Sequence, residues 1–214
     1  MRRARFGTWG LLLASCMFAV PEISHADLGV EDAERIARAT WYEGIPASAV
    51  SQLDPPAVVH LTAMLGDAAE RKHHATILEL LGRAGGPGAF EAIAAFTAST
   101  PVGEVDTATY RARLTAPMAL GLLAREDDRA WAELARAAGR RTPRDWHYRH
   151  IGGERLGRIL ERRVVAAVAL SARPEARALL GRLAREGGDA ELRAHASDLE
   201  AWMASDGAAG AQGR

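Results

Sequence analysis

Residues 64–93 read MLGDAAERKHHATILELLGRAGGPGAFEAI, and this stretch predicts two helices joined by a short turn. Asp67 followed by Glu70 is the pattern of a helix capping box, so a helix is expected over about 68–82. The Gly and Pro residues at 85–88 end that helix, and an apolar repeat typical of a helix resumes after them. The stretch therefore predicts a protein built from helical hairpins.

The same arrangement recurs further along the chain. LGRAGGPGAFEAIAAF from Leu81 aligns with LAREDDRAWAELARAA from Leu123 and LSARPEARALLGRLARE from Leu170, at offsets of 42 and 47 residues. Offsets of this size are typical of arrays of helical hairpins. Start and stop signals predict a leading helix over 29–43, a helical turn near 47–53, and four hairpins from helices at 55–65, 68–82, 87–98, 106–124, 127–138, 154–172, 174–186 and 189–204.

Two of these units resemble the HEAT repeat. In the first, an apolar helix end is followed by Asp67, Arg71, Ala75, Leu81-Gly82 and a Gly-Pro turn. The last unit, LAREGGDAELRAHASDLEAWM at 183–203, repeats the pattern with Asp189 and Arg193. The middle units match less well, because longer loops interrupt them and Pro117 lies inside a predicted helix.

The resemblance implies an all-α fold, a right-handed α-solenoid of about four helical hairpins with a scaffold or binding role. It assigns structural turn roles to Asp67, Arg71, Asp189 and Arg193, and no chemistry, because a fold alone does not specify a reaction. The composition agrees with helices: aromatic residues make up only 6%, and Ala and Leu supply most of the apolar content. The formal net charge of zero argues against nucleic acid as a partner.

The N-terminus resembles an export signal. Three Arg residues precede an apolar run over about 9–20, and Ser24-His25-Ala26 has the form that a signal peptidase cleaves. We expect cleavage after Ala26 and location in the periplasm or outside the cell. The predicted division is a signal peptide at 1–26, a HEAT-like helical repeat domain at 27–206 and a disordered tail at 207–214.

The alternative is that the exported protein is a lipoprotein. Leu13-Ala14-Ser15-Cys16 resembles a lipobox, which would place a lipid anchor on Cys16, the only cysteine. The apolar run is shorter than the roughly 20 residues that a membrane-spanning helix needs, so no transmembrane segment is expected in the mature chain.

The stretch RRTPRDWHYRHIGG at 140–153 is the candidate binding loop. Residues 140–163 contain eight Arg and three acidic residues, which gives this segment a net charge of about +5. Trp and Tyr are residue types that dominate interface hot spots, and Arg at positions 155, 158 and 162 share one helix stripe. The candidate partner-binding residues are Arg140, Arg141, Arg144, Trp146, Tyr148, Arg149, Arg155, Arg158 and Arg162. The alternative is a connector whose aromatic residues pack against the fold.

Loop lengths predict where this stretch lies. The connections at 99–105 and 139–153 are longer than the others inside the hairpins. Because a hairpin array places such loops on one edge, these two should be neighbours.

Motifs for catalysis are absent from the sequence. Asp145, His147 and His150 have only a weak metal-like spacing, and no G-x-S-x-G, S-x-x-K or P-loop occurs. We expect no cofactor, no metal, and a non-catalytic binding or scaffold protein of the bacterial cell envelope. It would recognise a protein partner with an acidic surface through the solenoid surface and the 140–150 loop. The alternative is an enzyme or enzyme-maturation factor of the HEAT-like lyase type, with an unidentified active site.

Overall fold

The computed structural model describes residues 28–41, 44–141 and 145–212, and side chains up to Ser205. It is mostly helical (73%), with ten helices packed against each other. This confirms the predicted helical class, and the superhelical form of a solenoid stays a prediction. The predicted signal peptide, Cys16 and Arg144 lie outside the described residues.

The elements follow one another as short helices with brief connections. The helices are α1 (Val30–Arg38), α2 (Ala47–Ser51), α3 (Pro55–Gly66), η1 (Ala68–His73, 3-10), α4 (His74–Ala84), α5 (Ala89–Ala98), α6 (Thr107–Leu123), α7 (Asp128–Ala137), α8 (Gly153–Leu170), α9 (Pro174–Glu186) and α10 (Ala190–Gln212). Two strands, β1 (Gly103–Glu104) and β2 (Trp146–His147), complete the described part of the chain. Most predicted helix ends lie within two residues of these bounds.

Three predicted helix boundaries are wrong. The predicted helix 29–43 ends at Arg38, where the indole N–H of Trp41 donates to the carbonyl of Ile36 at 3.0 Å and satisfies a carbonyl at the helix end. α10 continues to Gln212, past the predicted end near 204. The domain boundaries at residues 26 and 206 stay predictions.

The third correction concerns the predicted helix 68–82, which begins as the 3-10 helix η1. The carboxylate of Asp67 accepts from the backbone N–H of Ala69 at 2.8 Å, as a cap should. Glu70 does not complete a capping box, because its carboxylate accepts from Arg38 of α1. This hydrogen bond lowers the pKa of Glu70.

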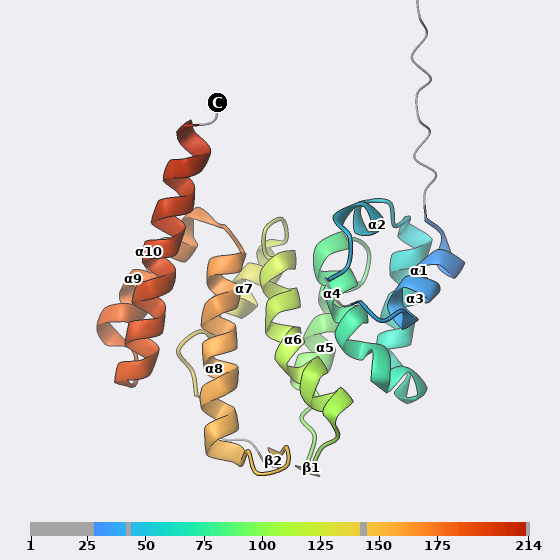
Figure 1. Cartoon of the computed structure of the whole chain (residues 1–214), viewed down its shortest axis with the longest axis horizontal. Helices are drawn as coiled ribbons and strands as arrows, with labels where there is room; N and C mark the ends of the chain where they lie inside the picture. The colour runs from blue at the N-terminus through green and yellow to red at the C-terminus, as the bar shows by residue number, and fades with distance from the viewer. Residues whose placement is uncertain (1–27, 42–43, 142–144, 213–214) are drawn as a thin grey trace, which may run out of the picture.

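The helices form two layers. α4, α6, α8 and α10 lie side by side in chain order, and α5, α7 and α9 lie behind them (Figure 1). One core cluster of buried residues runs through all ten helices, from Ala33 of α1 to Ala196 of α10. The packing therefore joins the hairpins into one continuous structure.

Small residues set the spacing within the front layer. A Cβ added to Gly82 of α4 would lie 2.6 Å from the Cα of Ala119 in α6, and one added to Gly121 of α6 would lie 2.5 Å from the carbonyl oxygen of Ala167 in α8. These glycines let the backbones of neighbouring helices touch. Ala75, the small residue of the HEAT-like pattern, is only partly buried, so the close contact of α4 lies at Gly82 instead.

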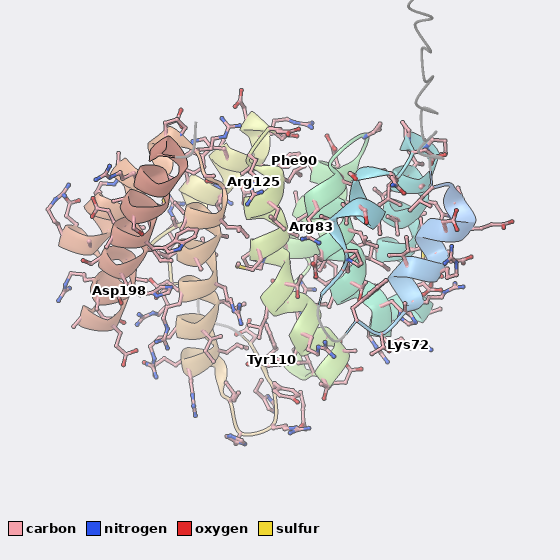
Figure 2. All side chains as sticks on the ribbon, turned by 45° about the horizontal axis from the view of Figure 1, so that its top comes forward. Lys72, Arg83, Phe90, Tyr110, Arg125 and Asp198 are labelled. Carbon is pink, nitrogen blue, oxygen red and sulfur yellow. The ribbon has the colours of Figure 1, made fainter. Side chains whose placement is uncertain are left out.

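Arginine side chains connect successive hairpins at their ends. Arg83 donates to the carbonyl of Ile45 at 2.8 Å and Arg125 donates to that of Leu170 at 3.1 Å; both are labelled in Figure 2. Arg173, three residues after Leu170, in turn donates to the carbonyl of Ala124, the residue before Arg125. The bonds to Leu170 and Ala124 satisfy carbonyls that helix ends leave without an intrahelical donor, and the bond to Ile45 satisfies a carbonyl of the connection before α2.

The turn residues of the HEAT resemblance make local contacts. Asp189 caps α10 by accepting from the backbone N–H of Leu192 at 2.8 Å, and Arg193 donates to the carbonyl of Gly187 at 2.9 Å. Arg71 forms an ion pair of 3.2 Å with Asp106. Among the helices that the structure describes, none is long and apolar enough to cross a membrane.

Candidate functional site

The two long loops meet at one edge of the molecule. β1 and β2 pair in parallel, with the Gly103 N–H donating to the Asp145 carbonyl at 3.0 Å and the Val105 N–H to the His147 carbonyl at 2.9 Å (Figure 1). The prediction that loops 99–105 and 139–153 are neighbours is confirmed. Backbone pairing fixes their relative position, so this edge is built from both loops together.

Trp146 anchors this loop pair from inside. Its side chain is only 2% exposed and belongs to a second core cluster with Val105, Leu156 and Leu160. The fold itself removes most of this large apolar surface from water, which favours the connector interpretation for Trp146. A direct role of Trp146 in partner binding stays a prediction.

Tyr148 lies at the margin of the same cluster. Its ring stacks on Tyr110 of α6 with centroids 4.2 Å apart, and its hydroxyl lies 3.1 Å from the Thr107 hydroxyl. Arg149, at a positive φ of 50°, places its guanidinium 5.0 Å from the Tyr148 ring centroid. Tyr148 is therefore partly exposed but already held by two aromatic or cationic neighbours.

Much of the predicted basic stripe is neutralised by ion pairs. Arg141 forms an ion pair of 2.9 Å with Glu161, and the Glu161 side chain is only 3% exposed. Arg141 also contacts Asp189 at the start of α10. Arg158 pairs with Glu154 at 3.1 Å and Arg162 with Glu191 at 3.5 Å. The i,i+4 spacing of Glu154 and Arg158 is visible in the sequence, but the pairs with Asp189 and Glu191 are not, because these residues approach Arg141 and α8 only in the folded chain.

The same network affects the protonation of Asp189. The Leu192 backbone N–H lowers the pKa of this carboxyl group, and the hydrogen bond from Arg141 lowers it further. Arg141 thus links the loop to α8 and α10, and Arg162 links α8 to α10, whereas Arg158 pairs within α8. Within the described residues, the predicted cations without a carboxylate partner are Arg140, Arg149 and Arg155.

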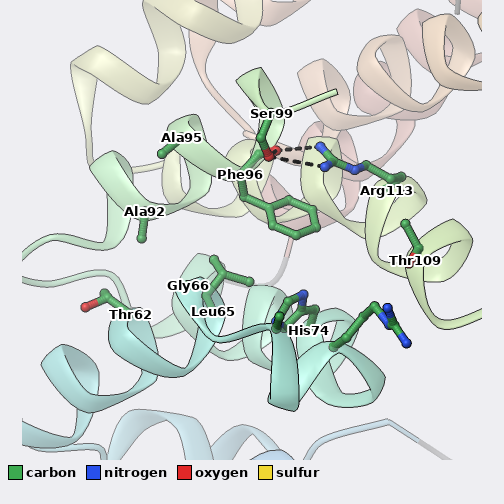
Figure 3. A pocket seen from close by; sticks show the side chains of 12 residues that line it. Thr62, Leu65, Gly66, His74, Ala92, Ala95, Phe96, Ser99, Thr109 and Arg113 are labelled. Carbon is green, nitrogen blue, oxygen red and sulfur yellow. Dashed lines mark hydrogen bonds between the residues drawn. The ribbon is translucent and has the colours of Figure 1, made fainter. Parts of the chain in front are cut away.

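Two clefts lie on either side of the C-terminal end of α5. The first, the Phe96 cleft, encloses about 540 Å³ between α3, α4, α5 and α6 (Figure 3). The ring edge of His74 meets Phe96 at a centroid distance of 5.6 Å, and the Arg113 guanidinium lies 4.3 Å from the Phe96 centroid. Arg113 also donates to the Ser99 hydroxyl at 3.2 Å. Phe96 is therefore fixed between two side chains.

The second, the Trp146 cleft, encloses about 260 Å³ between α5, α6, α7 and α8. Its apolar wall includes Trp146, Leu160 and the buried Pro117 of α6. Charged side chains also line it: Arg113, Glu133, Arg136, Arg140 and Glu161. The end of α5 forms the ridge between the clefts, and Arg113 lines both.

Two candidate binding residues, Arg140 and Trp146, line this cleft. Arg113 and Glu161 of the same cleft and Phe96 of the first cleft were not predicted as site residues, and they come from three different helices. Pro117 inside a predicted helix was the one local signal near them. The clefts arise between hairpins, so no single segment carries their pattern.

Metal ligation has no support in the described residues, where no three His, Cys, Asp or Glu side chains gather closely enough to hold an ion. Nε2 of His74 lies 3.0 Å from the carbonyl oxygen of Asp67. Comparison of the chain with protein-family models, curated proteins and solved structures finds no match. The HEAT resemblance therefore stays an expectation, and the site must be interpreted from its own geometry.

Proposed function

We propose that this protein is an exported, non-catalytic binding module of the bacterial cell envelope with a HEAT-like solenoid form. It would recognise an acidic segment of a partner protein at the edge where the two long loops meet. The observation that supports the proposal is the Trp146 cleft, which has apolar walls and arginine side chains in its lining. A concave, mostly apolar site with a few polar groups is the usual form of a binding site.

The chemistry of the cleft fits a short acidic and apolar segment. Ala94, Ala98 and Pro101 supply apolar contact beside Trp146. Arg140 has no carboxylate partner in the described residues, whereas Arg136 already pairs with Glu133. An apolar side chain of the partner would enter the cleft, and a neighbouring carboxylate would bind Arg140 through charge-assisted hydrogen bonds.

The loops are held before any partner arrives. The β1–β2 pairing and the burial of Trp146 fix the loop backbone against α8. A site that is already ordered loses less conformational entropy on binding. Trp146 would therefore act through the shape of the cleft, and Arg140 through direct contact.

Selection of random peptides against the purified protein tests this proposal. Peptides enriched on wild type should combine Asp or Glu with a large apolar residue. Arg140→Glu should weaken their binding at least tenfold, since a favourable charge contact becomes a repulsive one. Arg182→Glu on the exposed surface of α9, outside the lining of this cleft, is the matched control and should bind as wild type does.

Two results would contradict the proposal. Selected peptides without acidic residues would reject the acidic partner, and equal losses for both arginine variants would show a general charge effect. Export is tested separately by mass spectrometry of the mature chain, which should begin at Asp27. Detection of a diacylated Cys16 would instead show that the protein is anchored to a membrane by lipid.

A further inference from the structure

A third concave surface, the Trp41 groove, lies away from both clefts. It encloses about 480 Å³ between the segment after α1, the η1–α4 junction and α6. It shares no lining residue with the Phe96 cleft or the Trp146 cleft. Any ligand bound here would therefore occupy a site separate from the one proposed above.

Positively charged side chains outnumber acidic ones in the described lining of this groove. Arg38, Lys72 and Arg111 line it, and Glu79 is the one carboxylate among the described lining residues. Glu79 already pairs with Arg83 at 3.4 Å. Arg38 binds Glu34 and Glu70, but Lys72 and Arg111 have no carboxylate partner among the described residues.

The neighbouring histidine reflects the same environment. Burial lowers the pKa of His73, and the charge of Lys72 lowers it further. Like charges that line one groove repel each other, and a bound anion would relieve that repulsion. The groove thus favours a negatively charged occupant.

The remaining lining residues indicate what the anion is attached to. Trp41 is 36% exposed, and its indole N–H is already donated to the Ile36 carbonyl, so its ring surface is what it can offer a ligand. Four threonines also line the groove: the hydroxyls of Thr107 and Thr115 already bond to Tyr148 and to the Arg111 carbonyl, and those of Thr40 and Thr76 have no hydrogen-bond partner among the described residues. Hydroxyls both donate and accept hydrogen bonds, and an aromatic face provides flat apolar contact.

We propose that the Trp41 groove binds an acidic sugar. The anionic group, a carboxylate or a phosphate, lies between Lys72 and Arg111. The sugar ring packs on the exposed indole of Trp41, and its hydroxyls bond to the threonine side chains. This site does not depend on the proposed peptide-binding function.

Tryptophan fluorescence of the full mature chain tests the assignment with four probes. Glucuronate and glucose 6-phosphate should change the emission in a saturable way, and Trp41→Phe should remove most of that change. Glucose and inorganic phosphate should bind at least tenfold more weakly, because each supplies only half of the contacts. The comparison of glucuronate with glucose 6-phosphate also shows which anionic group is preferred.

Charge variants locate the anion. Lys72→Met and Arg111→Met remove charge while keeping side-chain length, and together they should weaken binding of the acidic sugars at least tenfold. Arg163→Met, an exposed arginine on α8 outside the groove, is the matched control and should bind as wild type does. Both side chains are exposed, so melting temperatures should not change.

Specific outcomes overturn the proposal. No saturable signal from either acidic sugar, even well above millimolar concentration, would reject it. If inorganic phosphate bound as tightly as the acidic sugars, the groove would be an anion site that does not recognise the sugar. If an acidic peptide bound more tightly than the acidic sugars, the ligand would be a protein segment instead of a sugar. Because Arg140→Glu lies outside this groove, that variant should bind the sugars normally whether or not the peptide proposal holds.

Discussion

Four arginine residues of the described chain cross-link separate parts of the fold. Arg83, Arg125 and Arg173 donate to backbone carbonyls of other helices or turns, and Arg141 joins the buried Glu161 to Asp189. A guanidinium has five donors in a rigid plane, so one side chain can satisfy acceptors from two elements. An arginine-rich sequence therefore need not form an arginine-rich binding surface.

Replacing Trp146 tests the role of burial at the residue scale. Trp146→Ala should lower the free energy of unfolding by about 3 to 5 kcal/mol, because it leaves a large cavity in the second core cluster. Trp202→Ala, at a side chain that is 48% exposed, is the control and should cost about 1 kcal/mol or less. Chemical denaturation of both variants measures the difference. Similar losses would mean that Trp146 is not a core residue.

Asp127 gives a pH-dependent prediction. Its pKa is lowered, first by the hydrogen bond from the Arg129 side chain and then by the Arg129 and Ala130 backbone N–H groups. A depressed pKa stabilises the fold above the unfolded value of about 3.9, and this contribution is lost as pH falls through the lower folded pKa.

Asp127→Asn keeps a capping oxygen but removes the titration. At neutral pH the variant should be less stable than wild type by about 1 kcal/mol or less, because the Arg129 side chain is 59% exposed and solvent screens the ion pair. The difference should shrink as the pH is lowered below about 4. Urea unfolding at both pH values measures it, with Asp198→Asn on the exposed surface of α10 as the control. A difference that grows on acidification would contradict the argument.

At the scale of elements, the front layer depends on close helix contacts. Gly82 and Gly121 each face the backbone of the next helix, which lets α4, α6 and α8 approach closely. The HEAT-like pattern drew attention to Ala75, whereas these contacts are made by glycines at other heights along the helices. Backbone contact of this kind leaves no space for a Cβ atom.

Gly121→Ala should therefore destabilise the protein. The new Cβ would meet the carbonyl oxygen of Ala167 at 2.5 Å, so α6 and α8 must separate. We expect a net loss of about 1 to 3 kcal/mol, even though alanine favours helix more than glycine does. Gly66→Ala at the end of α3 has open space around it and should be neutral or stabilise by up to about 1 kcal/mol. Thermal and chemical unfolding of the Gly121→Ala and Gly66→Ala variants measures the difference in stability. Equal effects of the two substitutions would contradict the close contact between α6 and α8.

At the scale of the whole molecule, one core runs through every helix. The cluster from Ala33 to Ala196 leaves no hairpin with a separate core of its own, apart from the small cluster around Trp146. Three concave surfaces lie between the hairpins rather than on any one of them. Ligand sites and stability thus depend on the same packing of neighbours.

The continuous core predicts cooperative unfolding. Helix content followed by circular dichroism and tryptophan emission should change at the same denaturant concentration, because no hairpin can lose its neighbours and stay folded. Trp41, Trp131, Trp146 and Trp202 report from four separate places along the chain. Two distinct midpoints would show that the array divides into independent units.

The sequence by itself determined the helices, their order and the meeting of the two long loops. Local rules sufficed for these features: Asp54 and Asp127 cap helix starts, and loop length places 99–105 beside 139–153 in an array. The predicted capping box failed because a distant residue intervened: Arg38 of α1 binds the Glu70 carboxylate.

Only the tertiary structure decided which side chains of the basic and aromatic stretch are buried or paired. Burial of Trp146 and pairing of Arg141 and Arg162 depend on residues from α6, α8 and α10 that are far apart in the chain. Whether an arginine is free for a partner is set by the carboxylates that packing brings beside it. Periodicity and capping act within a few residues, whereas burial and charge compensation are properties of the whole packed array.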